Sequence, residues 1–268
     1  MVSYNKGLSL KDFSDQEFRD LARTIFPHWC HDYPDFPNGV EKAKVWEVCQ
    51  AYRGLADHGA LGEDKEILGV GAGHEQTVFY LTNFAKRVFA TDLYDVDTVW
   101  QEAKVDMLKR PEKVLVPGIK WRPRRLVTQY MDALNLRYED ESFDGIFSCG
   151  SIEHFGSLEN VSKAAQEMGR VLKPGGVLTL STEYRISGPE GVGIPGAILF
   201  TADMLEEYII RPSGLIAIDS FVKEVDDATV TEAYNLEEAL TSGQRDRSIC
   251  LEHGNYIWTS ASLCLRRI

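Results

Sequence analysis

The sequence predicts an α/β protein whose strands form a doubly wound, mostly parallel sheet. From Lys65 onward, short apolar stretches typical of strands alternate with stretches of helical periodicity, as in sheets of this class. The first apolar stretch, EILGV, ends in glycines, as a strand does where such a sheet binds a ligand. Residues 1–62 differ in character. We therefore expect an N-terminal helical cap or lid over 1–62 and an α/β domain over 63–268.

The N-terminal segment is expected to hold two helices joined by an aromatic loop. Apolar residues recur at helical spacing from Leu10 to Phe26 and again from Val40 to Leu55. The stretch between them, PHWCHDYPDFPNG, is rich in proline and aromatic residues. It suits either a lid over a ligand or a connector packed on the core.

The α/β part is expected to contain seven strands, most of them separated by helices. The strands fall at residues 66–70, 87–92, 125–131, 142–150, 176–184, 214–221 and 256–267. The helices fall at residues 76–83, 96–108, 164–172 and 202–210. Thr201 is a suitable N-cap for the last helix, and Pro174-Gly175-Gly176 ends the helix before it. No regular crossover helix joins the final two strands, so we expect one of them to run antiparallel.

Charge and composition exclude several classes of protein. Lys plus Arg number 29 and Asp plus Glu 41, a formal charge of −12, which argues against nucleic-acid binding because phosphate neutralisation needs clustered cations. The five cysteines include no CxxC pair, so no disulfide framework or zinc ribbon is expected, and a reducing cytoplasm fits best. We expect no secretory signal and no membrane span. The prediction is a cytoplasmic protein without membrane or nucleic-acid partners and without metal-ligand residues, with its metal dependence and oligomeric state left open.

The turn after the first strand is the first motif that carries chemistry. It reads Glu66-Ile67-Leu68-Gly69-Val70-Gly71-Ala72-Gly73-His74-Glu75, and its glycines let a ligand approach the backbone. The dinucleotide pattern G-x-G-x-x-G fails from either starting glycine, because Gln76 or His74 stands at the sixth position. Taken alone, the motif suits a ligand site or a tight structural turn.

An aspartate follows each of the next two strands. Asp92 ends the second strand, 19 residues after Gly73, where a carboxylate can accept hydrogen bonds from both hydroxyls of a ribose. Asp132 follows the third strand and can accept from the exocyclic amine of an adenine, while the Ala133 N–H can donate to a ring nitrogen. Each aspartate also suits a helix cap or a turn.

Two further stretches complete a pattern. The fourth strand, SFDGIFSCG, continues into SIEHF, and the end of a later helix reads RVLKPGG. The series ILGVGAG, TDLY, FDGIFSCGSIEHF and RVLKPGG, in this order and at these spacings, resembles the class I S-adenosylmethionine-dependent methyltransferases. Within them it looks most like the small-molecule branch called type 11. The resemblance covers residues 64–185 firmly and the remainder loosely.

The resemblance implies a Rossmann-like methyltransferase fold with S-adenosylmethionine as the cofactor. It implies that the glycine turn lies beside the methionyl part, that Asp92 holds the ribose, and that Leu93 packs on the adenine. Asp132 and Ala133 contact the adenine, and the end of the fourth strand lies beside the cofactor. The cofactor residues are therefore Gly69, Val70, Gly71, Ala72, Gly73, Asp92, Leu93, Asp132, Ala133, Cys149 and Gly150.

Two positions depart from the family pattern. Family members usually carry an acidic residue where Gly69 stands, and often a glycine where Glu75 stands. The missing acid is expected to weaken the network around the amino group of the cofactor. Glu75 can compensate in part, because a carboxylate suits a helix N-terminus and a cationic ligand.

His154 is the candidate general base for a hydroxyl acceptor. It follows the fourth strand at the mouth of the expected cofactor site, and imidazole titrates near neutrality. The alternative is a structural histidine that bonds the backbone or covers the cofactor. Glu153 beside it can hold an amine, bind a metal or cap the following helix.

The walls of the acceptor site are expected from two segments. One is the aromatic stretch 28–36, with Trp29, His31 and Tyr33, and the other is the glycine- and proline-rich loop 186–200. Glu183 and Arg185, at the end of the fifth strand, are expected to point toward the same site. Arg185 can pair with a carboxylate or phosphate of the substrate or form a surface salt bridge.

The leading function is methyl transfer to a small molecule, such as a hydroxyl or amine of a sugar or natural-product intermediate. The methyl group of S-adenosylmethionine is already activated, so the protein mainly aligns the reactants and excludes water. One alternative is a catalytically degenerate, cofactor-binding regulatory protein, which the departures at Gly69 and Glu75 leave open. The other is a nicotinamide-dependent oxidoreductase, against which the failed dinucleotide pattern and the Asp132 motif argue.

Overall fold

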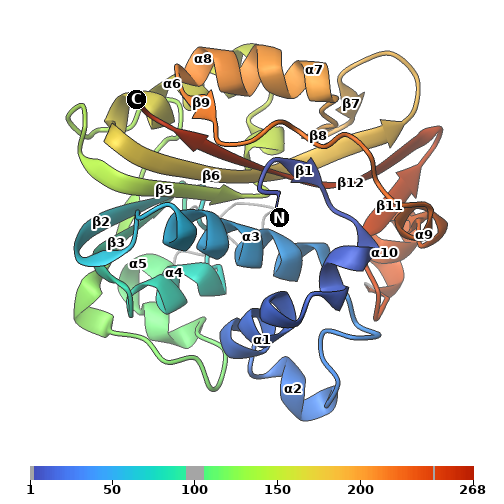
Figure 1. The fold of residues 1–268 in the computed structure, drawn as a ribbon, viewed down its shortest axis with the longest axis horizontal. Coiled ribbons are helices and arrows are strands. Elements are labelled where there is room, and N and C mark those ends of the chain that lie inside the picture. Colours follow the sequence, from blue (N-terminus) through green and yellow to red (C-terminus); the bar gives the residue numbers. More distant parts are fainter. Residues whose placement is uncertain (1–2, 95–105, 244) are drawn as a thin grey trace.

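The computed structural model describes residues 3–94, 106–243 and 245–268. A sheet runs through the middle of this part of the chain, and helices cover both of its faces (Figure 1). Its strands are β1 (Lys6–Gly7), β2 (Gly62–Val70), β3 (Ala85–Asp92), β4 (Leu126–Tyr130), β5 (Phe143–Cys149), β6 (Leu172–Ser187), β9 (Ile216–Ala217), β10 (Tyr234–Asn235), β11 (Cys250–His253) and β12 (Tyr256–Arg266). A separate hairpin consists of β7 (Gly193–Ile194) and β8 (Ala197–Ile198).

The strand order is that of a doubly wound sheet. Neighbouring strands follow the order β10-β11-β12-β6-β5-β2-β3-β4, and β1 and β9 pair with β12. From β4 to β6 the strands are parallel, whereas β12 is antiparallel to both β6 and β11. The chain order reverses between β2 and β5, and sheets of this class form their ligand crevice at such a reversal. The predicted mostly parallel sheet and its antiparallel closing strand are confirmed.

The helices divide between the two faces of the sheet. They are α1 (Gln16–Ile25), α2 (Trp29–Asp32), α3 (Ala43–Asp57), α4 (Gln76–Leu81), α5 (Asp106–Lys109), α6 (Leu158–Val171), α7 (Ala202–Leu205), α8 (Arg211–Ser213), α9 (Asp227–Thr231) and α10 (Leu236–Ser242). A π-helical turn, η5 (Glu206–Ile210), joins α7 to α8, and the 3₁₀ turns are η1 (Leu10–Ser14), η2 (Pro111–Lys113), η3 (Pro123–Arg125) and η4 (Ile152–His154). In Figure 1, α6, α7 and α8 lie on one face, and α3 and α4 on the other. No helix within the described ranges combines the length and apolar character that a membrane span requires.

Apolar side chains are buried on both sides of the central strands. Leu68 of β2 packs in one cluster with Met168 of α6, whereas its neighbour Ile67 packs in another with Leu55 of α3. This division follows from the pleat, because successive strand residues point to opposite faces. Parallel strands covered on both faces are nearly continuous in apolar residues, which is why stretches such as EILGV predict them well.

Part of the N-terminal segment lies directly on the sheet. A Cβ on Gly54 of α3 would come within 2.5 Å of Thr179 Cγ2 on β6, so glycine permits a very close approach of helix to sheet. Buried Asn5 donates to the carbonyl of Cys264 at 3.2 Å and accepts from its N–H at 2.8 Å. These contacts fix both ends of the segment against β6 and β12. The domain boundary at residues 62 and 63 stays a prediction.

Two predicted elements differ from the structure near the end of the chain. The strand expected over 214–221 is reduced to β9, because Asp219 turns away and accepts the backbone N–H groups of Tyr4 and Asn5 at 2.9 and 3.0 Å. β9 pairs with β12 only at Leu265 and Arg266, and the other end of β12 pairs with the short strand β11, which the sequence pattern did not predict.

One predicted helix lies largely outside the described residues, and another begins earlier than expected. The helix expected over 96–108 falls largely on residues 95–105, which lie outside the described residues, and α5 covers its end. The helix expected over 164–172 begins earlier, at Leu158, because the Ser157 hydroxyl accepts the backbone N–H of Asn160 at 3.2 Å and caps it.

Candidate active site

The candidate site lies at the carboxyl ends of the parallel strands. The turn after β2, the ends of β3 and β4, the η4 turn after β5 and the end of β6 meet at this edge. The predicted cofactor residues and His154, Glu153, Glu183 and Arg185 all lie in these segments. The topology therefore brings together side chains that are far apart in sequence, as expected for a sheet of this class.

The turn after β2 requires glycine at Gly71. Its φ of +60° lies in the left-handed region. A Cβ on Gly71 would also lie 2.5 Å from Ser151 Oγ and 2.7 Å from Ser151 Cβ. The turn is thus packed tightly against the segment that follows β5.

The space beside Gly69 explains why an acidic side chain is missing there. A Cβ on Gly69 would lie 2.6 Å from Phe147 Cζ and 2.9 Å from Ala72 Cβ. The buried Phe147 ring of β5 therefore fills the space that a longer side chain at Gly69 would need.

Asp92 ties the end of β3 to the glycine turn. Its Oδ2 accepts the N–H of Gly73 at 2.9 Å, and its Oδ1 accepts the N–H of Leu93 at 2.7 Å. Burial raises the pKa of Asp92, and these backbone donors act in the opposite direction. The Tyr94 hydroxyl donates to the carbonyl of Gly73 at 2.9 Å. Both the N–H and the carbonyl of Gly73 are therefore hydrogen-bonded to side chains at the end of β3 or just after it.

The end of β4 lies beside the end of β3. The N–H of Met131 donates to the carbonyl of Asp92 at 2.9 Å. Asp132 is exposed, and its Oδ1 accepts the N–H of Leu134 at 2.8 Å. Leu93 is 49% exposed. An apolar side chain and a carboxylate are therefore accessible at adjacent strand ends, with Ala133 next to them.

Lys44 of α3 completes the site, and sequence reasoning missed it. Its Nζ lies 2.7 Å from Glu47 Oε2 and 3.2 Å from Glu75 Oε1, and it donates to the carbonyl of Cys149 at 3.0 Å. A Cβ on Gly150, whose φ is +62°, would come within 2.8 Å of this ammonium. The available signal was an i, i+3 pair of opposite charges on a helix that is otherwise largely apolar.

The groups around Lys44 have displaced ionisation. Burial raises the pKa of Glu75 to about 7, with Lys44 opposing and Glu47 adding to the shift. Burial disfavours the charge on Lys44, but Glu47 and Glu75 outweigh it and hold the pKa of Lys44 well above its ordinary value. Glu75 Oε2 is buried and has no hydrogen-bond partner among the described residues. This oxygen therefore retains an unused capacity to accept a hydrogen bond beside the glycine turn.

Glu153 and His154 lie together after β5. Glu153 is buried, and its Oε2 accepts from the Thr182 hydroxyl at 3.0 Å, while its Oε1 lies 4.0 Å from His154 Nε2. His154 Nδ1 lies 2.7 Å from the carbonyl oxygen of Gly196. Burial raises the pKa values of Glu153 and Glu183.

The other predicted acceptor residues lie in two different surroundings. Arg185 donates to carbonyl groups of the loop that follows β6. His31 is 89% exposed beside Asp32, Tyr33 donates to Asp246 at 3.0 Å, and Trp29 stacks on Phe36 at 6.0 Å. In the part of the chain that the structure describes, these three side chains interact with residues near their own loop, not with the glycine turn. Their contact with an acceptor stays a prediction.

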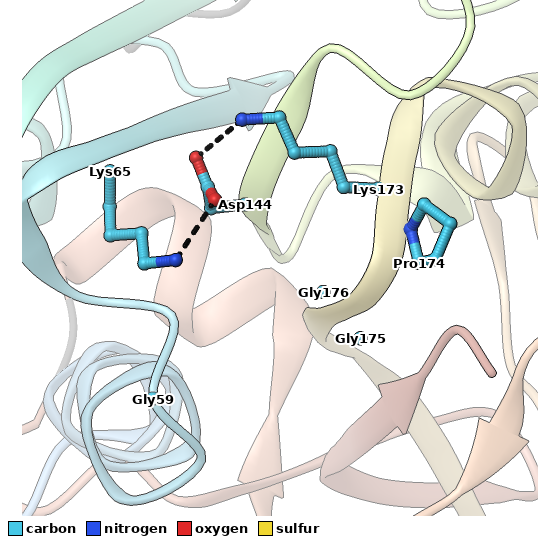
Figure 2. A pocket seen from close by; sticks show the side chains of 7 residues that line it. All are labelled: Gly59, Lys65, Asp144, Lys173, Pro174, Gly175 and Gly176. Carbon is cyan, nitrogen blue, oxygen red and sulfur yellow. Dashed lines mark hydrogen bonds and ion pairs between the residues drawn. The ribbon is translucent and has the colours of Figure 1, made fainter.

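A cavity lies at the opposite, amino ends of β2, β5 and β6. It encloses about 230 Å³ and is lined by Gly59, Lys65, Asp144, Lys173, Pro174, Gly175 and Gly176 (Figure 2). Asp144 accepts from Lys65 at 3.2 Å and from Lys173 at 2.8 Å, which ties the amino ends of β2, β5 and β6 together. These ion pairs are structural, and the cavity lies away from the candidate site. Among the described residues, no three His, Cys, Asp or Glu side chains are grouped to hold a metal ion.

A family model described as "Methyltransferase domain" matches residues 68–180. The matched region runs from the end of β2 into β6, and it includes the glycine turn, Asp92, Asp132 and His154.

Curated relatives match over shorter stretches. "Probable tRNA methyltransferase 9B" of Mus musculus is 44% identical over 59 residues, which are 22% of this chain and 13% of that protein. The 27-O-demethylrifamycin SV methyltransferase of Amycolatopsis mediterranei is 37% identical over 68 residues, 25% of this chain and 24% of that protein. The chain thus spans only 13% to 24% of the length of these relatives.

Solved structures share the fold over almost the whole chain. A Galdieria sulphuraria protein assigned as a sarcosine dimethylglycine methyltransferase has a TM-score of 0.56 and 17% identity, covering 92% of this chain and 98% of that one. The [4+2]-cyclase SpnF has a TM-score of 0.55 and 17% identity, covering 94% and 96%. At such identities the likeness shows the fold alone. Residues 68–180 therefore match a methyltransferase domain, and the chain as a whole has the fold of these solved structures.

Proposed function

We propose that the enzyme methylates a small-molecule acceptor, with the cofactor held at the carboxyl ends of β2 to β5. The bound cofactor supplies an activated methyl group, and the protein supplies binding, orientation and electrostatics. The residues proposed to hold it are Gly69, Val70, Gly71, Ala72, Gly73, Asp92, Leu93, Asp132, Ala133, Cys149 and Gly150.

The side chains present fit this cofactor. The Asp92 carboxylate accepts the backbone N–H groups of Gly73 and Leu93, and a carboxylate can accept a further hydrogen bond from a ribose hydroxyl. Leu93 offers exposed apolar surface beside it for an adenine ring. The unpartnered Glu75 Oε2 suits the ammonium group of the methionyl part. Phe147 excludes an acid at Gly69, and Glu75 supplies a carboxylate from the other end of the same turn.

The acidity of the interior supports a small acceptor rather than a nucleic acid, and it is the observation on which this choice depends. Burial and the nearby carboxyl group of Glu47 raise the pKa values of Glu75, Glu153 and Glu183. The charge of Lys44 lowers all three. A polyphosphate backbone would be repelled here, and the chain as a whole carries −12.

His154 is the proposed general base. It removes the proton from the hydroxyl or ammonium group of the acceptor, so that a neutral or anionic nucleophile is present at the mouth of the site. Glu153, whose Oε1 lies 4.0 Å from His154 Nε2, stabilises the imidazolium that forms. Glu183 and Arg185 border the same region, and Trp29, His31 and Tyr33 are proposed to extend the acceptor site.

The names of the two curated relatives point to different acceptors, tRNA for one and a small molecule for the other. Both matches cover a quarter of this chain or less, and the electrostatics of the site support the proposal of a small molecule. A degenerate protein that binds the cofactor without turnover is the remaining alternative.

The test has two stages. S-adenosylhomocysteine is titrated by calorimetry into wild type, Asp92→Ala and the control Asp203→Ala, whose side chain is 94% exposed on α7. Methyl-labelled S-adenosylmethionine is then supplied with a panel of small hydroxyl and amine compounds and, separately, with tRNA. We expect binding that only Asp92→Ala weakens, and label in a small molecule that His154→Gln abolishes. Label in tRNA alone, or binding without transfer to any acceptor, contradicts the proposal.

A further inference from the structure

We infer that the loop of residues 188–199 is a positioning element that fixes a proton on Nδ1 of His154 and presents its Nε2 to the acceptor, with Arg185 as the anchor of that loop. The inference deepens the proposed function and rests on His154 being the base. It assigns Arg185 a role through His154 rather than a direct contact with substrate.

The hydrogen bond from His154 determines its tautomer. Nδ1 lies 2.7 Å from the carbonyl oxygen of Gly196, and a carbonyl oxygen can only accept. Nδ1 therefore carries the proton, and the lone pair of the neutral ring lies on Nε2. Nε2 is the nitrogen on the side of buried Glu153, 4.0 Å from its Oε1. A base acts through the nitrogen that bears the lone pair, so this bond selects the reactive atom.

The hairpin aims the carbonyl of Gly196. Strand β7 pairs with β8 through Gly193 with Ile198 and Ile194 with Ala197, and Gly196 lies in the turn between them. Its φ is +88°, in the left-handed region that favours glycine, although no atom would obstruct a Cβ there. The backbone conformation of the turn, not the packing around it, therefore sets the direction of this carbonyl.

Arg185 holds both ends of the loop. Its Nη1 donates to the carbonyl groups of Pro189 and Gly191, each at 2.9 Å, and its guanidinium lies 5.9 Å from the centre of the Tyr256 ring. Its backbone N–H donates to the carbonyl of Phe200 at 2.9 Å, where the loop returns to β6. A guanidinium that satisfies two carbonyl groups at once fixes the outgoing limb of the hairpin, and through it the turn at Gly196.

The tautomer can be observed directly by ¹⁵N NMR of the histidine side chains, with S-adenosylhomocysteine bound. Spectra are recorded at about pH 8.5, roughly two units above the ordinary imidazole pKa, and His154→Gln identifies the signals. In wild type we expect His154 Nδ1 to show the shift of a protonated nitrogen and Nε2 that of an unprotonated one. In Arg185→Gln and in Gly196→Ala we expect loss of this pattern in favour of a proton on Nε2.

The controls separate this inference from the proposed function and from general unfolding. Arg124→Gln alters an exposed arginine on η3 and should leave the His154 spectrum unchanged. Arg185→Gln should still bind S-adenosylhomocysteine, because the proposed cofactor residues lie on β2 to β5. A proton on Nε2 of His154 in wild type, or an unchanged tautomer in both loop variants, overturns the inference while leaving the proposed function standing. Absence of cofactor binding in wild type refutes the proposed function instead.

Discussion

The carboxylate of Asp92 accepts the backbone N–H of Gly73 at 2.9 Å, so the end of β3 and the turn after β2 hold one another in position. Hydrogen bonds to charged groups contribute about 1.5–3 kcal/mol each. If the same carboxylate also holds the ribose, Asp92→Ala should weaken the binding of S-adenosylhomocysteine about 10- to 100-fold. Calorimetric titration measures this, and an affinity within about twofold of wild type contradicts the role.

Gly69 and Phe147 should be coupled energetically. Gly69→Ala places a Cβ 2.6 Å from Phe147 Cζ, which is expected to cost about 1–3 kcal/mol of unfolding free energy through overpacking. Phe147→Leu alone leaves a gap and also destabilises, but in the double variant the smaller side chain makes room for the new methyl group. Urea unfolding should therefore show a double variant more stable than the sum of the single effects predicts. Strict additivity would show that the two sites are independent.

The raised pKa of Glu75 makes its contribution to stability depend on pH. The folded protein holds this proton up to about pH 7, whereas the ordinary value is 4.5. Between pH 4.5 and 7, Glu75 is ionised in the unfolded chain but still protonated in the folded protein. Its contribution to the free energy of unfolding is therefore fully present below about pH 4.5 and is lost as the pH rises toward 7. The free energy of unfolding of Glu75→Gln should therefore rise relative to that of wild type as the pH increases, by up to about 3 kcal/mol above pH 7.

Urea unfolding at several pH values between 4.5 and 8 measures this difference. The matched control is Glu112→Gln, because Glu112 is exposed on η2. A constant difference between Glu75→Gln and wild type across this range would mean that the folded protein does not shift the titration of Glu75.

Lys44 should stabilise the protein by balancing Glu47 and Glu75. Lys44→Met leaves both carboxylates without their cation and is expected to cost about 1–3 kcal/mol, less than for a fully buried pair because the Lys44 side chain is 50% exposed. Adding Glu75→Gln removes one of the two carboxylates and should restore part of the loss. Thermal or urea unfolding of the two variants checks this, and a double variant less stable than Lys44→Met would contradict the balance.

The central strands could be predicted because their residues are buried on both faces. Ile67 and Leu68 pack into clusters on opposite sides of the sheet, so the sequence is apolar without interruption. The segment 214–221 is equally apolar, but Asp219 bonds the N-terminal segment and most of it does not pair. Whether this segment pairs as a strand thus depends on a contact between residues more than two hundred positions apart, which no local pattern contains.

The candidate site was predictable to the extent that it lies at strand ends. The positions of Gly71, Asp92 and Asp132 follow from where strands stop, and the structure brings them to one edge. Lys44 did not follow in this way, because it reaches the carbonyl of Cys149, 105 residues away, only once α3 lies on the sheet. The role of Arg185 was equally hidden, since its partners are backbone carbonyl groups with no signature in the sequence.

The close approach at Gly54 limits how the enzyme can open. Since α3 touches Thr179 where a larger residue would not fit, the helix that carries Lys44 is an integral wall of the site. Any motion of residues 1–62 is then confined to the stretch between β1 and Ala43, because Asn5 is bonded to Cys264 of β12. We expect the β7–β8 hairpin, which contacts His154 through Gly196, to be the part of the border that moves when acceptor and product exchange, so changes in hairpin length should alter turnover.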